Sequence, residues 1–284
     1  MTPDTDLRYR SRRAEQCRVP SDEEEVAGAW HSGGVHVTRI GFTSLKGARH
    51  LDRPFVDLAW DGPVGDRVFC LVDPARERVL RTVENPTLMA TRARWDSGVL
   101  TVALPGCQVE GEPAGTGETR TLDYWGRRVT LEVIDGPWAA AFSQHLGYDV
   151  ILARSPAGDV VYGASVSLVT TGSLDELSRR VGSTVLDSRF RATFTVHTDT
   201  PHVEDAWIGR RLQLGEAEIE VRSAIPRCAV IDLDPDTGMR RSDAMRALAA
   251  YRRQGNEVMF GVDAIVTKPG RVRVGHAVRP GAPG

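Results

Sequence analysis

Cysteine is scarce in this sequence of 284 residues, which contains Cys17, Cys70, Cys107 and Cys228. No two of them follow a Cys-x-x-Cys spacing, which argues against a zinc ribbon and against a thioredoxin-like redox site. An iron–sulfur cluster is also excluded, because its irons require closely spaced thiolates. Four cysteines are too few for a disulfide scaffold, so we predict a reducing compartment and a cytoplasmic location. We expect Cys70 to be a core residue and Cys107 to lie in an exposed turn.

The sequence also lacks a strong charge of either sign and any long hydrophobic run. It has 36 basic and 38 acidic residues, a formal net charge of -2, so nothing draws the whole chain toward nucleic acid. The longest apolar runs, such as 99–104, have the length of a strand. We therefore expect neither a signal peptide nor a membrane span. The hydrophobic share of 41% is that of an ordinary globular protein with a buried core.

Short strand-like segments between two polar ends make up most of the chain. Residues 1–33 are charged and aperiodic, so we predict a flexible tail there and a second, short tail over 280–284. The length favours about two domains. Alternating or uniformly apolar patterns predict strands over 36–42, 67–73, 99–106, 128–134, 148–154, 189–198, 217–225, 227–234, 259–267 and 271–278.

Three helices are predicted among these strands. They span 135–147, 173–182 and 242–255, each with a capping residue at its start and a glycine at its end. Residues 111–119, rich in Gly, Pro and Thr, predict a loop or a domain seam. The helices are too few for a repeating βαβ pattern, which disfavours a doubly wound parallel sheet. We predict an α+β fold, mainly β, with barrel-like antiparallel sheets.

The motifs of common nucleotide-binding and hydrolytic sites are missing. The sequence has no GxGxxG after a strand, no P-loop, no GxSxG and no HExxH. Asp232, Asp234 and Asp236 are spaced like the start of a calcium-binding loop, but Thr237 occupies the position where glycine is required. The segment instead predicts an ordinary turn that closes at Gly238.

Cys228 has neighbours that favour chemistry. It follows Arg227, and a neighbouring guanidinium favours the thiolate, which is a soft metal ligand. Other polar groups stand at predicted strand ends, namely Ser44, Lys46, Asp66, Arg67, Arg191 and Thr193. Guanidinium and hydroxyl groups are suited to an anionic, phosphate-bearing cofactor. From this pattern alone, however, an inert cysteine in the core remains the more common outcome.

Several segments closely resemble the MOSC domain, the C-terminal domain type of molybdenum cofactor sulfurases. They are ASVSLVTTGSLDELSRRVGSTVLDSRFRATFTV, the Arg227-Cys228 pair followed by DLDPDTG, and VMFGVDAIVTKPGRVRVGHAV. The segments IGFTSLKG, GDRVFCLVD and ENPTLMATRARWDSGVLTVALPG resemble its usual N-terminal companion. The resemblance covers about 34–279. It implies an N-terminal β-barrel domain over 34–134 and a MOSC β-barrel domain over 135–279.

The resemblance also implies a molybdenum cofactor, a molybdopterin, bound by residues at matching positions. In the mitochondrial amidoxime-reducing branch, a cysteine that matches Cys228 ligates the molybdenum. The family's cofactor-holding arginines match Arg67, Arg191 and Arg227, and a serine near the start matches Ser44. Two positions depart from the family pattern. Its lysine before that serine is Thr43 here, although Lys46 is close, and its Pro-Asn after the arginine is Ala192-Thr193.

The implied activity is that of a molybdenum-dependent oxidoreductase. Such an enzyme would reduce an N-hydroxylated compound or an N- or S-oxide by oxygen-atom transfer. The chain has no flavin fingerprint or cluster cysteines, so electrons would come from a ferredoxin, a cytochrome b5-like protein or a flavoprotein. Two alternatives remain open: a sulfur-transfer or C–S bond-cleaving enzyme that uses Cys228 as its nucleophile, and a cofactor carrier without turnover.

Overall fold

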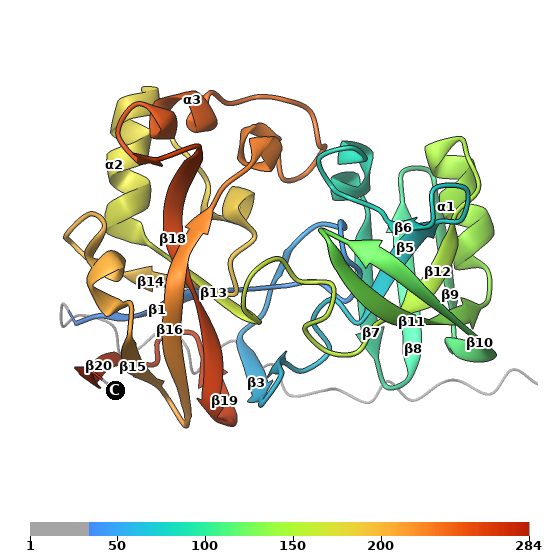
Figure 1. Ribbon diagram of the computed structural model, residues 1–284, viewed down its shortest axis with the longest axis horizontal. Helices are drawn as coiled ribbons and strands as arrows, with labels where there is room; N and C mark the ends of the chain where they lie inside the picture. Colours follow the sequence, from blue (N-terminus) through green and yellow to red (C-terminus); the bar gives the residue numbers. More distant parts are fainter. Residues whose placement is uncertain (1–33, 284) are drawn as a thin grey trace, which may run out of the picture. The chain divides into compact units, whose positions relative to one another are not determined.

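The computed structural model describes residues 34–283, so the tail predicted over 1–33, with Cys17, lies outside the described residues. Strands dominate the part that is described (Figure 1). The α-helices are α1 (Trp138–Leu146), α2 (Thr171–Val181) and α3 (Ala244–Ala249), and four 3-10 helices are η1 (Pro86–Ala90), η2 (Asp187–Phe190), η3 (Val203–Trp207) and η4 (Ala229–Asp232). The prediction of an α+β, mainly β fold is confirmed. None of the helices in residues 34–283 is long and apolar enough to cross a membrane.

A nine-stranded sheet carries most of the second half of the chain. Its order is β2-β1-β14-β13-β18-β16-β15-β20, with β17 paired to β18. These strands are β1 (His36–Phe42), β2 (Leu51–Asp52), β13 (Val166–Thr170), β14 (Phe194–His197), β15 (Arg210–Leu214), β16 (Ala217–Pro226), β17 (Arg253–Gln254), β18 (Glu257–Lys268) and β20 (Val278–Pro283). Alternate apolar side chains of the long strands form a common core, in which Ile219, Val221 and Val262 are fully buried. The pairing is antiparallel except between β13 and β14.

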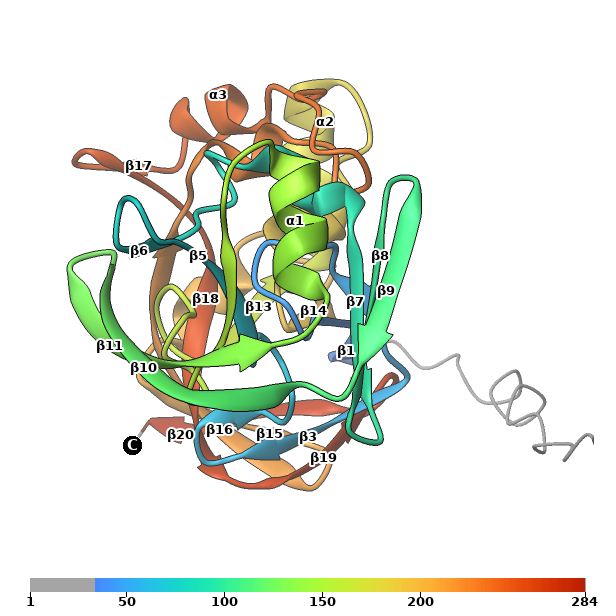
Figure 2. The same ribbon diagram turned by 90° about the vertical axis from the view of Figure 1, so that its right-hand side faces the viewer.

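A closed barrel of five strands lies beside this sheet and comes largely from the first half (Figure 1). It contains β5 (Phe69–Asp73), β6 (Arg78–Val79), β10 (Ala114–Tyr124), β11 (Arg127–Asp135) and β12 (Ile151–Arg154). All five residues of β5 are buried, as its apolar character on both faces predicts. Figure 2 shows α1 between the barrel strands and a three-stranded sheet of β7 (Arg92–Asp96), β8 (Val99–Leu104) and β9 (Cys107–Gly111). A second small sheet joins β3 (Phe55–Ala59), β4 (Gly62–Pro63) and β19 (Gly270–Arg273).

Strand pairing links the two halves of the chain across the predicted boundary at residue 134. Strand β1 pairs with β14, β3 pairs with β19, and β12 completes the barrel by pairing with β5. The described residues, 34–283, accordingly form one compact unit by their contacts. The division into domains of 34–134 and 135–279 stays a prediction.

Two of the predicted strands are wrong at the places that matter most for the site. Of 189–198, only Phe194–His197 is a strand, because η2 precedes it and Arg191 takes a left-handed backbone conformation with φ of 52°. Of 227–234, residues 229–232 form η4 instead of a strand. In both segments a short 3-10 helix buries the apolar side chains that we expected in a strand. For a run of only a few residues, hydrophobic periodicity does not distinguish a helical turn from a strand.

The ends of the chain's elements also differ in part from the prediction. Helices α1 and α2 end at Gly147 and Gly182 as predicted, but α3 ends at Ala249, well before Gly255. Residues 114–119 belong to strand β10 instead of a loop. The tail predicted from 280 is wrong up to residue 283, because β20 pairs there with β15.

Candidate functional site

A cavity of about 370 Å³ brings together residues that are far apart in the sequence. Five of the predicted site residues line it: Lys46, Arg67, Arg191, Arg227 and Cys228. Arg81 and Arg189 also line the cavity, so that six of its lining residues are cationic. Glu257 is the one acidic residue among them. Such an excess of positive charge in a concave site attracts an anionic ligand.

A short backbone ladder places Lys46 beside Arg67. The Lys46 amide donates to the Phe69 carbonyl across 2.8 Å, and the Phe69 amide donates to the Ser44 carbonyl across 2.9 Å. The Arg67 amide in turn donates to the Thr43 carbonyl across 2.7 Å. These bonds hold the segment after β1 against the start of β5, so both cations project from one rigid pair of segments.

The Arg67 guanidinium is held by three acceptors. It donates to Asp66 Oδ2 across 2.6 Å, contacts His50 Nε2 at 2.8 Å and donates to the Arg191 carbonyl across 3.0 Å. Asp66 is itself buried and accepts the Thr43 amide across 2.9 Å. A fixed guanidinium presents its remaining donors in a defined direction, as recognition of an anion requires.

Burial and mutual repulsion lower the pKa values of two further cations, Lys46 and Arg191. Burial, followed by the charges of Arg67 and Arg191, lowers the pKa of Lys46 from 10.5 to about 7. Burial and then Arg67 lower the pKa of Arg191 from 12.5 to about 9. The Arg191 side chain donates to the Ala48 carbonyl across 2.8 Å, and among the described residues no carboxylate forms an ion pair with it. A bound anion would stabilise the charged forms of Lys46 and Arg191.

Arg227 and Cys228 also line the cavity. Arg227 donates to the carbonyls of Phe260 and Phe190 across 2.7 and 3.1 Å, and its second terminal nitrogen is buried without a partner. Burial lowers the pKa of Arg227 to about 10. Cys228 is a free, exposed thiol at the N-terminal cap of η4, directly after β16. The Cys228 thiol is therefore accessible at the edge of the cavity.

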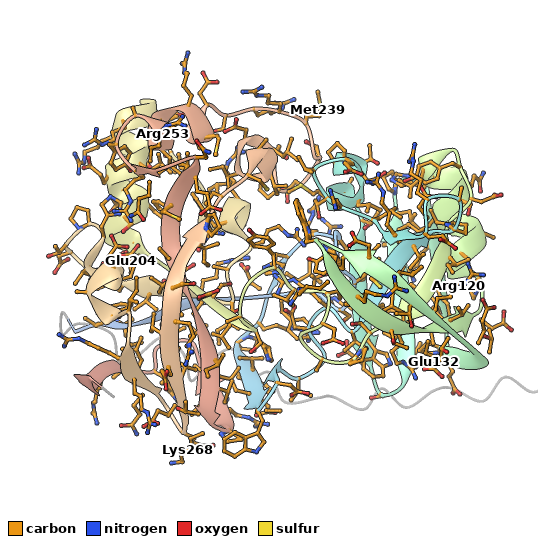
Figure 3. The ribbon with its side chains drawn as sticks, viewed as in Figure 1. Arg120, Glu132, Glu204, Met239, Arg253 and Lys268 are labelled. Atoms are coloured by element: carbon orange, nitrogen blue, oxygen red, sulfur yellow. The ribbon has the colours of Figure 1, made fainter. Side chains whose placement is uncertain are left out.

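The turn after η4 ties the cysteine segment to the first half of the chain. Asp234 accepts hydrogen bonds from the amides of Asp236 and Thr237, as expected for an ordinary turn, and Met239 follows it (Figure 3). Arg49 donates to the Asp236 carbonyl across 2.5 Å. Gly238 has a φ of 73° and lies so close to the Pro86 carbonyl that a Cβ atom would clash. This contact fixes where the second half meets η1.

Two predicted site residues do not line the cavity. Ser44 is fully buried, and its hydroxyl has no partner among the described residues. Thr193 is buried as well, and its hydroxyl accepts the Ser167 amide across 3.1 Å. Ser167 lines the cavity in its place. Thr43 is fully buried, and its hydroxyl donates to the Leu45 carbonyl across 3.1 Å, whereas Lys46 lines the cavity.

Several cavity residues were not found from the sequence. Arg81 and Arg189 line it, and His50 supports Arg67 from behind. The sequence could have indicated Arg189, because it stands two residues before the predicted site residue Arg191. His50 and Arg81 have none, because their roles depend on contacts between distant segments.

These observations define a mainly β protein with a cationic cavity and a free cysteine at its edge. Residues 149–279 match the family model of the MOSC domain, so this part of the chain is similar to that domain. Arg191, Arg227 and Cys228 lie within the matched segment, whereas Lys46 and Arg67 precede it. The predicted resemblance is confirmed for this family.

Curated relatives are similar at modest identity. Mitochondrial amidoxime-reducing component 1 of Homo sapiens is 28% identical over 120 residues, which cover 39% of this chain and 35% of that protein. Molybdenum cofactor sulfurase of Oryza sativa subsp. japonica is 28% identical over 174 residues, 50% of this chain and 21% of that protein. The chain thus aligns with between about a fifth and a third of the length of these two relatives.

Two solved structures match the chain with low scores. The YuaD protein of Bacillus subtilis matches with a TM-score of 0.44 at 12% identity, over 88% of this chain and 97% of that chain. YiiM of Escherichia coli matches with a TM-score of 0.31 at 13% identity, over 42% of this chain and 54% of that chain.

The donor set of the cavity suits an anionic cofactor that brings most of its own metal ligands. Within residues 34–283, no group of three or more His, Cys, Asp and Glu side chains is placed to hold a metal ion. Cys228 alone would offer one soft ligand. The unpartnered nitrogen of Arg227 and the uncompensated charges of Lys46 and Arg191 fit a phosphate or another anionic group.

Proposed function

We propose that the chain binds a molybdenum cofactor in this cavity and reduces an N-hydroxylated compound or an N- or S-oxide by oxygen-atom transfer. The observation that carries the proposal is the position of one exposed thiol, Cys228, on a cavity lined by six cations and one carboxylate. The MOSC match and the name of the rice relative, molybdenum cofactor sulfurase, support the cofactor, and the name of the human relative supports reduction of an amidoxime.

Each cavity residue has a role that follows from its contacts. Lys46, Arg67 and Arg191 would hold the anionic groups of the cofactor, and Arg227 would neutralise negative charge next to the sulfur of Cys228. Cys228 would be the protein ligand of the metal. When bound, such a cofactor supplies a redox-active metal centre that exchanges an oxygen atom with a substrate. An external ferredoxin, cytochrome b5-like protein or flavoprotein would return the electrons, and a reducing cytoplasm suits the free thiol.

The metal content of the purified protein tests the proposal. The chain is produced in a host that makes the cofactor, and molybdenum is measured by mass spectrometry in the wild type, Cys228→Ala and Cys107→Ala. Cys107 is also free and exposed, and it does not line the cavity, so it is a matched control. We expect metal in the wild type and in Cys107→Ala and a loss of most of it in Cys228→Ala. Reduction of benzamidoxime with a chemical electron donor is then measured on the loaded protein.

The outcomes separate the alternatives. A wild type without molybdenum would contradict the reductase proposal, and metal that is retained in Cys228→Ala would contradict the ligand role. A loaded protein that reduces no amidoxime, hydroxylamine or sulfoxide would favour a cofactor carrier or a sulfur-transferring or C–S bond-cleaving enzyme. In the sulfur-handling enzymes, Cys228 would act as the nucleophile.

A further inference from the structure

Two aromatic side chains line the part of the cavity that faces solvent. Trp125 and Tyr162 are 42% and 49% exposed, although both belong to residue types that usually bury most of their ring surface. Their rings meet edge to face with centroids 5.6 Å apart and planes inclined by 69°. Val83 and Val161 line the cavity beside them. We call Trp125 and Tyr162 the aromatic rim.

Specific contacts hold the aromatic rim in place. Trp125 stands at the turn between β10 and β11 with a φ of 53°, and the carboxylate of Asp123 accepts the amide of the next residue, Gly126, across 3.0 Å. The Arg81 guanidinium lies over the Trp125 ring, 4.2 Å from its centroid. A stacked guanidinium covers part of one face of the indole and fixes its orientation.

The loop that carries Tyr162 is fastened at two places. Arg127 donates to the Val161 carbonyl across 2.6 Å. The buried carboxylate of Asp263 accepts the Ala164 amide across 2.9 Å and, with its other oxygen, the amide and hydroxyl of Ser223. These contacts connect the loop to β11 on one side and to β16 and β18 on the other. Tyr162 is therefore positioned by both halves of the chain.

The chemistry of the cavity divides into two regions. Lys46, Arg67 and Arg191 provide charge, whereas the rim provides aromatic surface, with the Arg81 guanidinium on one face of Trp125. The volume of about 370 Å³ is at the lower end of the roughly 300–1,000 Å³ of small-molecule sites, so with the cofactor held by the cations a substrate ring would lie at the exposed rim. Aromatic rings prefer edge-to-face or offset contacts with a third ring, and such contacts discriminate a planar ring from a saturated one.

We propose that Trp125 and Tyr162 bind the planar, aromatic part of a small-molecule substrate and thereby determine substrate choice. This proposal rests on the proposed reductase function for the reaction itself, but the binding preference can be measured without turnover. The non-reacting ring would lie against the rim while the N–O group points toward the Cys228 side. Binding energy from a remote ring then orients the reacting group.

A pair of ligands that differ only in ring type tests the rim. Benzamidoxime and cyclohexanecarboxamidoxime are titrated by calorimetry into the cofactor-loaded protein without an electron donor. We expect the wild type to bind benzamidoxime about threefold to tenfold more tightly, which is the range of one or two aromatic contacts. The preference should disappear in Trp125→Leu/Tyr162→Leu and persist in Trp125→Phe/Tyr162→Phe.

Control variants keep the test interpretable. Trp60 is 69% exposed and does not line the cavity, so Trp60→Leu should keep the preference. If the double variant does not fold, the single variant Tyr162→Leu, at an exposed loop position, replaces it in the test. Equal affinities for the two ligands in the wild type, or no measurable binding of either, would overturn the proposal. Loss of molybdenum in the leucine variants, with retention in the phenylalanine variants, would show that the rim contacts the cofactor and would also overturn it.

Turnover separates this proposal from the reductase proposal. Both amidoximes are also offered to the loaded wild type with a chemical electron donor. A binding preference without reduction of either compound would contradict the proposed reaction and leave the rim proposal intact. Reduction of both at equal kcat/KM, with equal affinities, would support the reaction and contradict the rim proposal.

Discussion

Arg67, which lines the cationic cavity, contacts the buried His50 behind it, with a guanidinium nitrogen 2.8 Å from the Nε2 atom of the imidazole. Because the guanidinium has only donors, His50 must accept at Nε2 and carry its proton on Nδ1. Burial, followed by the charges of Arg67, Arg191 and Arg39, keeps the pKa of His50 well below its usual 6.5. His50 therefore positions Arg67 only in its neutral form.

Acidification should destabilise the protein through His50. The folded state leaves this imidazole neutral, whereas the unfolded chain protonates it below about pH 6.5, so the unfolded chain binds more protons and stability falls as pH falls. We compare urea unfolding of the wild type and His50→Gln, because glutamine can accept from Arg67 but does not titrate. Below about pH 6, the free energy of unfolding of the wild type should fall more steeply, by up to about 1.4 kcal/mol per pH unit. Parallel curves would contradict this role.

Lys46 should make anion binding depend on pH near neutrality. Its pKa of about 7 means that the ammonium charge is lost as pH rises through this value. Sulfate is a suitable probe, because its own charge does not change in this range. We expect sulfate affinity, measured by calorimetry on cofactor-free protein, to fall about tenfold as pH rises from about 6 to about 8.5. Lys46→Met should bind sulfate weakly at both values, and a wild type without pH dependence would argue against Lys46 as an anion ligand.

The pKa shift of Lys46 also has a consequence for stability. Between about pH 7 and 10.5 the unfolded chain keeps the lysine proton that the folded chain has released, so the wild type should become more stable as pH rises through this window. Lys46→Met should lack this increase. Urea unfolding at several pH values within the window measures the difference between the two proteins.

Substitution of Arg191 should separate its charge from its backbone strain. Arg191→Ala and Arg191→Gly both remove the guanidinium, and both should lower molybdenum content strongly. Because Arg191 has a φ of 52°, the glycine variant should be more stable than the alanine variant by about 1 kcal/mol. Metal content and thermal unfolding are measured on the same samples. Metal loss that follows stability across the two variants would show that Arg191 is a purely structural residue.

Thiol labelling should distinguish the cysteines of the described residues. Cys107 and Cys228 are exposed, whereas Cys70 is fully buried and burial raises the pKa of its thiol to about 12. Iodoacetamide should therefore alkylate Cys107 and Cys228 in cofactor-free protein and leave Cys70 unmodified. In cofactor-loaded protein, Cys228 should be protected and Cys107 should react as before. Peptide mass spectrometry reads each site, and equal labelling of Cys228 in both forms would contradict its role as a metal ligand.

The sequence by itself determined much of the local structure. Strand β1 occupies 36–42 as its pattern predicts, and the uniformly apolar segment around Cys70 is the buried strand β5. Gly147 and Gly182 end their helices, because glycine readily takes the left-handed conformation of a helix C-terminus. Arg227 and Cys228 were also found from the sequence, through their adjacency and the resemblance to the MOSC domain. Each of these features depends on neighbours within a few residues.

The tertiary structure alone decided how the cavity is assembled. Arg191 enters it from a left-handed residue after η2 instead of from a strand, and Ser44 and Thr193 are buried outside its lining. His50 reaches Arg67 through a contact between segments that carry no common pattern. Trp125 and Tyr162 meet because a hairpin turn and a loop pack together across the two halves of the chain. Such contacts depend on long-range packing and on the burial of charge, and neither is encoded in the spacing of residues along the sequence.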